Sequence, residues 1–160
     1  MNRQFLSSAV VTVLLLSAPG VPLTARHTAA HCKAIHADLV ESRSTTVCKP
    51  SDPVCFVGEV DGNHGLRGTT YFRGDSRTDP IPTSPQFIGY SGVFEYTTDH
   101  GTLIARESGV TSPAQGVVTA HQRITDATGD YAGATGYFFV SGSNDGQNVV
   151  TTVVGQICYP

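Results

Sequence analysis

Charged side chains that could carry acid–base chemistry occur at alternate positions of several β-type runs. Glu95 lies in one such run, and His121 and Arg123 lie in a later one. A carboxylate and an imidazole that face one space can transfer protons, so Glu95 and His121 are the catalytic candidates. An arginine would hold the anionic head group of a ligand. The ligand-binding candidates are Glu59, Tyr96, Arg106 and Arg123.

These side chains also have a simpler interpretation. Charged residues of a sheet usually lie on its solvated face or form cross-strand ion pairs. Neighbouring strand residues point to opposite faces, and a shift of one residue exchanges the two faces. The sequence alone leaves both interpretations open.

The remaining motifs give no sign of a metal or cofactor site. His31, His36, His64 and His100 share no ligand spacing, and no C-x-x-C pair occurs. A G-x-S-x-G nucleophile elbow is also missing from the sequence. The glycines of 129–136 precede a strand-like run, whereas a phosphate-binding loop precedes a helix. We therefore expect a structural turn there, no metal site and no cofactor.

Four cysteines could link distant parts of the fold. They are Cys32, Cys48, Cys55 and Cys158. An even number in an oxidising compartment implies two disulfides, and four cysteines allow three pairings. We favour Cys48–Cys55, which closes a short proline-containing loop, together with Cys32–Cys158, which ties the start of the mature chain to its C-terminus.

The first residues have the order of a secretory signal peptide. Arg3 gives the positive start, an apolar run from Ala9 to Leu16 follows, and small residues stand at Ala25 and Ala30. Cleavage after either alanine fits the small-residue rule. The run is shorter than the roughly 20 residues of a membrane-spanning helix. We expect a secreted chain with a signal peptide over 1–25, an N-terminal arm over 26–54 and a β-barrel domain over 55–160.

Composition narrows the class of protein and its partners. Of 160 residues, 39% are apolar and 14% are charged, and the net charge is −3. Such a chain is too apolar to be disordered and long enough for one domain. Without a basic run it lacks the electrostatic signature of nucleic-acid binding. We expect neither a nucleic-acid partner nor a membrane partner once the signal peptide is removed.

Short β-type runs separated by turn residues predict an all-β fold. The runs are 55–60, 66–73, 87–98, 101–109, 116–126, 135–142 and 149–158. Seven or eight strands at this spacing indicate an antiparallel barrel or sandwich, and barrel closure removes exposed edges. Residues 75–86 hold three prolines and are expected to form a loop. Residues 27–47 are expected to form a short helix or an extended arm.

Alternation along these strands separates an apolar face from a polar one. The apolar set, expected to pack, is Phe94, Tyr96, Ile104, Val118, Ala120, Ile124, Phe138 and Val140, and the polar set is Glu59, Glu95, Glu107, His121 and Arg123. An eight-stranded barrel has an interior just wide enough for side chains or one small ligand. Which set lines that interior stays open.

Several stretches of the chain resemble the allene oxide cyclase barrel-like proteins, a group that includes the plant dirigent proteins. The stretches are Cys55–Gly62, Leu66–Thr70, Gly92–Thr98, Ile124–Gly136 and Val154–Pro160. The most specific is Ala-Thr-Gly-Asp-Tyr-Ala-Gly-Ala-Thr-Gly, which is similar to a glycine-rich turn before a late barrel strand of that family. The resemblance covers roughly Cys55 to Pro160 and looks closest to secreted bacterial members.

This resemblance implies an eight-stranded antiparallel closed barrel, here with a disulfide-tied N-terminal arm. Plant members are often trimers, so a homo-oligomer, either a trimer or a dimer, is one expected assembly. They cyclise an unsaturated fatty-acid epoxide or steer phenoxy-radical coupling. Their active-site sets do not recur here residue by residue, so no activity is carried over.

Two functions from different classes are therefore expected. The first is a secreted barrel that binds a small apolar ligand or a partner without chemistry. The alternative is a cyclase-, isomerase- or dirigent-like catalyst that orients a reactive intermediate inside the barrel and excludes water. A deep apolar cavity with a buried carboxylate or histidine at its base would favour chemistry, and a filled interior would favour a structural role.

Overall fold

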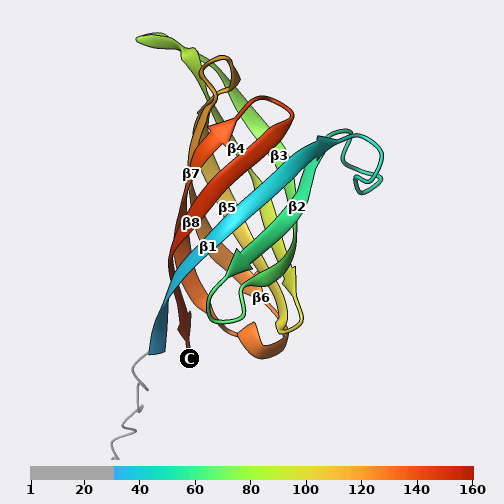
Figure 1. The fold of residues 1–160 in the computed structure, drawn as a ribbon, viewed down its shortest axis with the longest axis vertical. Coiled ribbons are helices and arrows are strands. Elements are labelled where there is room, and N and C mark those ends of the chain that lie inside the picture. The colour runs from blue at the N-terminus through green and yellow to red at the C-terminus, as the bar shows by residue number, and fades with distance from the viewer. Residues whose placement is uncertain (1–30) are drawn as a thin grey trace, which may run out of the picture.

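Residues 31–160, which the computed structural model describes, form a closed β-barrel (Figure 1). The expected signal peptide over 1–25 and both of its cleavage sites lie outside the described residues. The eight strands are β1 (His31–Ser44), β2 (Cys55–Gly62), β3 (Arg67–Ile81), β4 (Ser84–Thr98), β5 (Gly101–Ser112), β6 (Val117–Ala127), β7 (Thr135–Asn144) and β8 (Asn148–Tyr159).

Each strand pairs antiparallel with the next, and β1 pairs with β8 to close the sheet. The expected all-β, eight-stranded closed barrel is therefore confirmed. One end of the barrel carries the projecting β3–β4 hairpin and is called the hairpin end; the opposite end, where the chain finishes, is called the C-terminal end (Figure 1). Within residues 31–160, no helix is long and apolar enough to cross a membrane.

Strand β1 replaces most of the expected N-terminal arm. His31–Ser44 pairs with β2 on one side and with β8 on the other, so the barrel includes this segment and does not begin at Cys55. Ile35, Ala37 and Leu39 stand at alternate positions and are buried, which is the period of a strand. Of the two alternatives expected over 27–47, the short helix is wrong for residues 31–44, and the extended alternative is a paired strand of the barrel instead of a separate arm.

The proline-rich segment is a hairpin and not the expected loop. Strand β3 continues to Ile81 and β4 begins at Ser84. The pairing shifts register on both sides of Pro80, and the segment is largely exposed. A proline is tolerated in a strand where the ladder is irregular or at an edge, which explains how the prolines fit here.

The C-terminal end of the barrel is closed by packed side chains. Tyr131 belongs to a short 3-10 turn, η2 (Gly129–Tyr131), and its hydroxyl donates a 2.9 Å hydrogen bond to the carbonyl oxygen of Gly65. Leu66, Leu103 and Ile157 are fully buried. The segment 129–136 is thus the structural turn expected from its glycines, and β7 follows it in place of a helix.

Both favoured disulfides are present. Cys32 and Cys158 lie directly opposite each other in the β1–β8 pair, 126 residues apart in sequence. Cys48 and Cys55 close the short loop that leads into β2 at the hairpin end. One bridge therefore fixes the seam where the barrel closes, and the other restrains a loop at its rim.

Most of the expected packed face points into the barrel. Phe94, Tyr96, Val118, Ala120, Ile124, Phe138 and Val140 are all buried. Ile104 was expected to join them but is only partly buried, and Leu103 and Ala105 point inward instead. Ala105 pairs directly with Phe94, so the inward face of β5 needs a small residue beside that ring.

Candidate functional site: a cavity inside the barrel

The half of the barrel interior nearest the hairpin end is hollow. It holds a cavity of about 660 Å³, within the usual range for small-molecule sites. Pro113 and Gly146, from the connections β5–β6 and β7–β8, lie at its mouth. The apolar wall consists of Leu39, Phe56, Phe72, Ile88, Phe94, Val118, Val140 and Val149.

Two glutamates lie in the deep part of this cavity. Glu41 of β1 and Glu107 of β5 both line it, and each is only 5% exposed. Glu41 continues the inward series of Leu39, and Glu107 continues that of Ala105, because alternate strand residues share a face. The barrel therefore presents two carboxyl groups from different strands to one cavity.

Glu107 ends a chain of buried hydrogen bonds. The amide nitrogen of Gln122 donates to its carboxyl oxygen at 2.5 Å, and the amide oxygen of Gln122 accepts from the hydroxyl of Tyr96 at 2.6 Å. The hydroxyl of Tyr90 also donates to Glu107. Gln122 and Tyr96 are fully buried, so these contacts fix Glu107 firmly in place.

Glu41 is held much more loosely. In the part of the chain that the structure describes, its one hydrogen bond comes from the hydroxyl of Thr70 at a long 3.4 Å. A carboxylate can accept about four hydrogen bonds. The carboxyl group of Glu41 is therefore free to contact a molecule in the cavity.

Burial changes the protonation of both carboxyl groups. Burial, followed by the nearby charge of Glu107, raises the pKa of Glu41 to about 8, although the hydrogen bond from Thr70 opposes this. Burial also raises the pKa of Glu107, against the hydrogen bonds from Gln122 and Tyr90. Near neutral pH, Glu41 thus keeps a proton that it can donate into an apolar space.

The two glutamates lack a basic partner within residues 31–160. The ion pairs found there join other carboxylates, such as Asp75 and Glu95, to Arg106 and Lys49. Arg43 and Arg77 line the cavity, but both are exposed. Positive charge is therefore present at the mouth and missing beside Glu41 and Glu107.

The two catalytic candidates from the sequence lie outside the barrel. Glu95 accepts a 2.7 Å hydrogen bond from Lys49 in an ion pair on the outer face of β4. His121 is exposed on β6, beside the rings of Tyr137 and Phe139. Strands β4 and β6 are separated by β5, so the structure does not bring Glu95 and His121 together.

The ligand-binding candidates are divided between the two faces. Glu59 and Arg123 are exposed on the outer surface. Arg106 pairs with Asp75, with one contact at 2.8 Å, and also donates to Ser91. Tyr96 alone points inward, where it lies beneath the cavity and bonds to Gln122.

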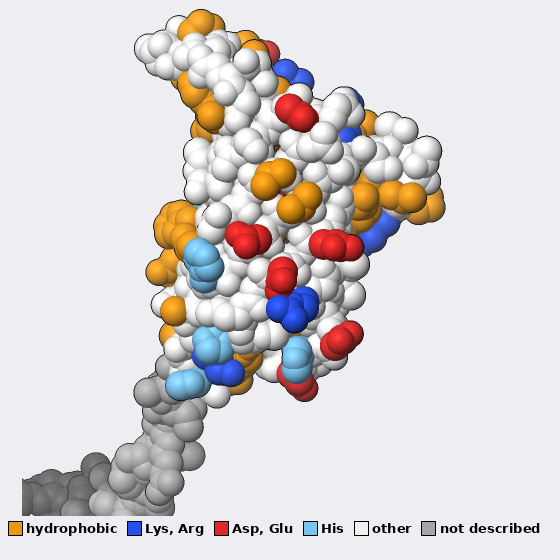
Figure 2. Space-filling view, viewed as in Figure 1, with side chains coloured by type: hydrophobic (Ala, Val, Ile, Leu, Met, Phe, Trp, Pro, Cys, Tyr) orange, Lys and Arg blue, Asp and Glu red, His pale blue; other side chains and the backbone are white. Residues whose placement is uncertain are grey.

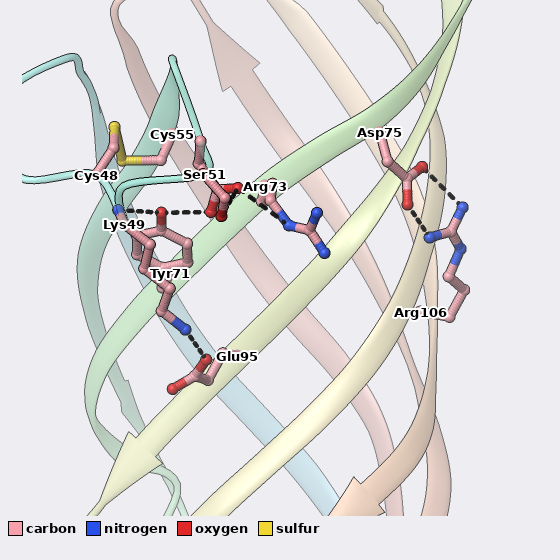
Figure 3. A network of polar contacts seen from close by, with 10 residues as sticks. Cys48, Lys49, Ser51, Cys55, Tyr71, Arg73, Asp75, Glu95 and Arg106 are labelled. Atoms are coloured by element: carbon pink, nitrogen blue, oxygen red, sulfur yellow. Dashed lines mark hydrogen bonds and ion pairs between the residues drawn. A yellow bond between two sulfur atoms is a disulfide. The ribbon is translucent and has the colours of Figure 1, made fainter.

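A network of polar contacts on the outer face pins the loop of the Cys48–Cys55 disulfide to the barrel (Figure 3). Asp52 accepts a 2.8 Å hydrogen bond from the hydroxyl of Tyr71, which itself accepts one from the backbone of Lys49. Burial opposes ionisation of Asp52, but these bonds together with Arg73 and Lys49 lower its pKa. The outer charges thus have a structural role at the rim.

The histidines of residues 31–160 do not gather into a metal site. His31, His36, His64 and His100 are exposed, and the histidine side chains visible in Figure 2 lie on the outer surface of the barrel. Within the described range there is no group of three His, Cys, Asp or Glu side chains placed to hold a metal ion.

Sequence reasoning missed the most important residues of the cavity. Alternation in the sequence groups Glu107 with Glu95 on the polar face, and no sequence motif singles out Glu41. The available signal was spacing: Glu41 stands two residues after Leu39 in the series Ile35, Ala37, Leu39. A carboxylate that continues an apolar alternation faces the interior.

Comparison with known proteins leaves the family open. No protein-family model matches the chain, and no curated protein matches it.

Proposed function

We propose that this protein binds a small, mainly apolar molecule inside its barrel. The observation that carries the proposal is the 660 Å³ cavity with an aliphatic and aromatic wall. Sites for small molecules are usually concave, largely apolar and supplied with a few polar groups that fix orientation. Glu41, Glu107 and Tyr90 supply those groups here.

We further propose that the chain is a secreted protein of the allene oxide cyclase barrel-like group. The quoted motifs and the order of charge, apolar run and small residues at the start support this. Two disulfides are typical of proteins in oxidising compartments. The closed eight-stranded antiparallel barrel agrees with the architecture that the resemblance implies.

A dye-binding experiment tests whether the cavity takes a ligand. Phenylnaphthylamine is a neutral dye that fluoresces more strongly in apolar surroundings. Val149 lines the cavity and Val150 lies on the outer face of the same strand. Val149→Phe should narrow the cavity and weaken dye binding at least tenfold. Val150→Phe adds the same bulk outside and should leave the affinity unchanged.

The outcome is decided by the difference between these two variants. Circular dichroism and an unfolding curve first establish that each variant is folded. If folded Val149→Phe binds the dye as tightly as the wild type, or if Val150→Phe weakens binding equally, the dye does not occupy the cavity. Either result would contradict the proposed function.

The alternative function is a cyclase-, isomerase- or dirigent-like catalyst that orients a reactive intermediate in the cavity. The specific observation in its favour is Glu41, a proton donor near neutral pH inside an apolar space. Isomerisation of styrene oxide to phenylacetaldehyde tests it, since Glu41 would protonate the oxygen as a C–O bond breaks and recover a proton after the hydride shift. Wild-type acceleration that is lost in Glu41→Gln supports catalysis, and equal rates would exclude this reaction.

A further inference from the structure

The acidic part of the cavity has unused capacity to bind. Glu41 and Glu107 have no basic partner within residues 31–160, and Glu41 accepts only the long contact from Thr70. Buried carboxylates usually have a cation or several hydrogen bonds as compensation. A molecule that supplied a positive charge at this point would satisfy both groups.

Aromatic rings line the same cavity. Phe72 is the centre of a cluster in which its ring centroid lies 6.3 Å from that of Phe56, 5.9 Å from Tyr90 and 6.0 Å from Phe94. All four rings line the cavity. The negative faces of aromatic rings attract organic cations, and they also bury the apolar part of a ligand.

These two features together select one class of ligand. We propose that the cavity binds a hydrophobic cation, with an ammonium group at Glu41 and Glu107 and an apolar body against the rings of Phe72 and its neighbours. This proposal rests on the proposed function, namely that the cavity binds a small apolar molecule. A carboxylate ligand is disfavoured at this position, because it would place a third acidic group beside two others.

The other ionisable groups around the cavity do not supply this charge. Tyr90 and Tyr96 on β4 have raised pKa values because they are buried, so they stay neutral. Arg43 on β1 and Arg77 on β3 are exposed at the mouth, where water and salt screen them. An ammonium group therefore meets the carboxyl pair without a competing cation at close range.

Calorimetry with two matched probes tests the proposal. Naphthylethylamine and naphthylethanol have the same apolar body, and an alkylammonium stays charged up to about pH 10, as lysine does. The amine should bind the wild type at least tenfold more tightly than the alcohol near pH 8. Glu41→Gln should remove this preference, so that the amine and the alcohol bind with similar affinity. Glu59→Gln, which removes an exposed outer charge, should keep the preference.

The pH dependence of amine binding gives a second test of the proposal. With the pKa of Glu41 at about 8, roughly one molecule in ten carries the ionised carboxylate near pH 7. Affinity for the amine should therefore rise about tenfold between about pH 7 and pH 9, and affinity for the alcohol should stay level.

The possible results separate this proposal from the proposed function. If the alcohol binds as tightly as the amine and both displace phenylnaphthylamine, the cavity binds apolar molecules and the preference for a cation is overturned. If Glu59→Gln removes the preference as Glu41→Gln does, the attraction is only general surface charge, which also overturns it. If neither probe binds and the dye does not bind, the proposed function itself fails.

Discussion

Glu41 and Glu107 occupy positions where the apolar alternation of β1 and β5 would otherwise continue. Valine or leucine at either position would fill the cavity and avoid the cost of burying a carboxyl group. The same spacing that marks a core position thus marks these glutamates as inward-facing. These two glutamates are candidates for function because they are buried in the cavity, whereas the glutamates of the outer face are not.

The raised pKa of Glu41 predicts how stability depends on pH. Its pKa is about 8 in the folded protein and about 4.5 as a free side chain, so the folded state holds its proton more tightly. The free energy of unfolding should fall as pH rises from about 4.5 to about 8 and level off above that. Glu41→Gln should remove this penalty and stabilise the protein by on the order of 3 kcal/mol near pH 7.

Urea unfolding measured between about pH 5 and pH 9 checks this prediction. The wild-type midpoint should decline across the range, and that of Glu41→Gln should decline less. Glu59→Gln, on the outer surface, should follow the wild type. Parallel curves for wild type and Glu41→Gln would mean that Glu41 is not protonated in the folded protein near neutral pH.

Glu95 should matter little to the fold. Its ion pair with Lys49 lies on the outer face, and the lysine side chain is 55% exposed. Exposed ion pairs contribute about 0 to 1 kcal/mol. Glu95→Gln should therefore fold normally and lose less than about 1 kcal/mol of stability, measured by thermal or urea unfolding. A variant that does not fold would show that Glu95 is a structural partner.

At the level of elements, the sequence predicts a strand well when the two strands that pair with it lie close to it in the chain. β4 to β8 follow from short runs separated by Gly, Asn and Asp turns. β1 was missed because one of its partners, β8, lies more than a hundred residues away, and because Ile35 and Leu39 also fit one face of a helix. The hairpin of β3 and β4 was missed because prolines usually end strands.

The two disulfides should differ in their contribution to stability. Cys32–Cys158 spans 126 residues and Cys48–Cys55 spans 7. On the loop-entropy relation, these spans correspond to about 5 and about 2.5 kcal/mol. Replacement of Cys32 and Cys158 by alanine should therefore lower the free energy of unfolding about twice as much as replacement of the rim pair. Equal losses in urea unfolding would contradict this ranking.

For the whole molecule, closure of the sheet decides what is inside. Strand β5 has Ile104 on one face and Leu103 with Glu107 on the other. Both faces therefore carry an apolar residue, and the composition of the strand alone does not show which face points into the barrel. The choice follows from packing against neighbouring strands, such as Ala105 of β5 beside Phe94 of β4. This is why the fold was predictable while the site was placed on the wrong face.

The interior of the barrel is filled by side chains at one end and hollow at the other. Tyr131, Leu66 and Ile157 close the C-terminal end, whereas the hairpin end opens into the cavity. A ligand would enter at the hairpin end, past Arg43 and Arg77, and stop where Tyr96 and Gln122 fill the interior. The outer surface carries exposed apolar side chains at Tyr137, Phe139, Val150 and Val154. This outer patch is the alternative binding site for an apolar dye.

Nuclear Overhauser contacts from bound phenylnaphthylamine to labelled methyl groups show directly whether a ligand lies inside the barrel. We expect contacts from the dye to Leu39, Val118 and Val140, which line the cavity. Contacts confined to Val40, Val150 and Val154, which are exposed on the outer face, would show that the barrel interior is not the binding site and would contradict the proposed function.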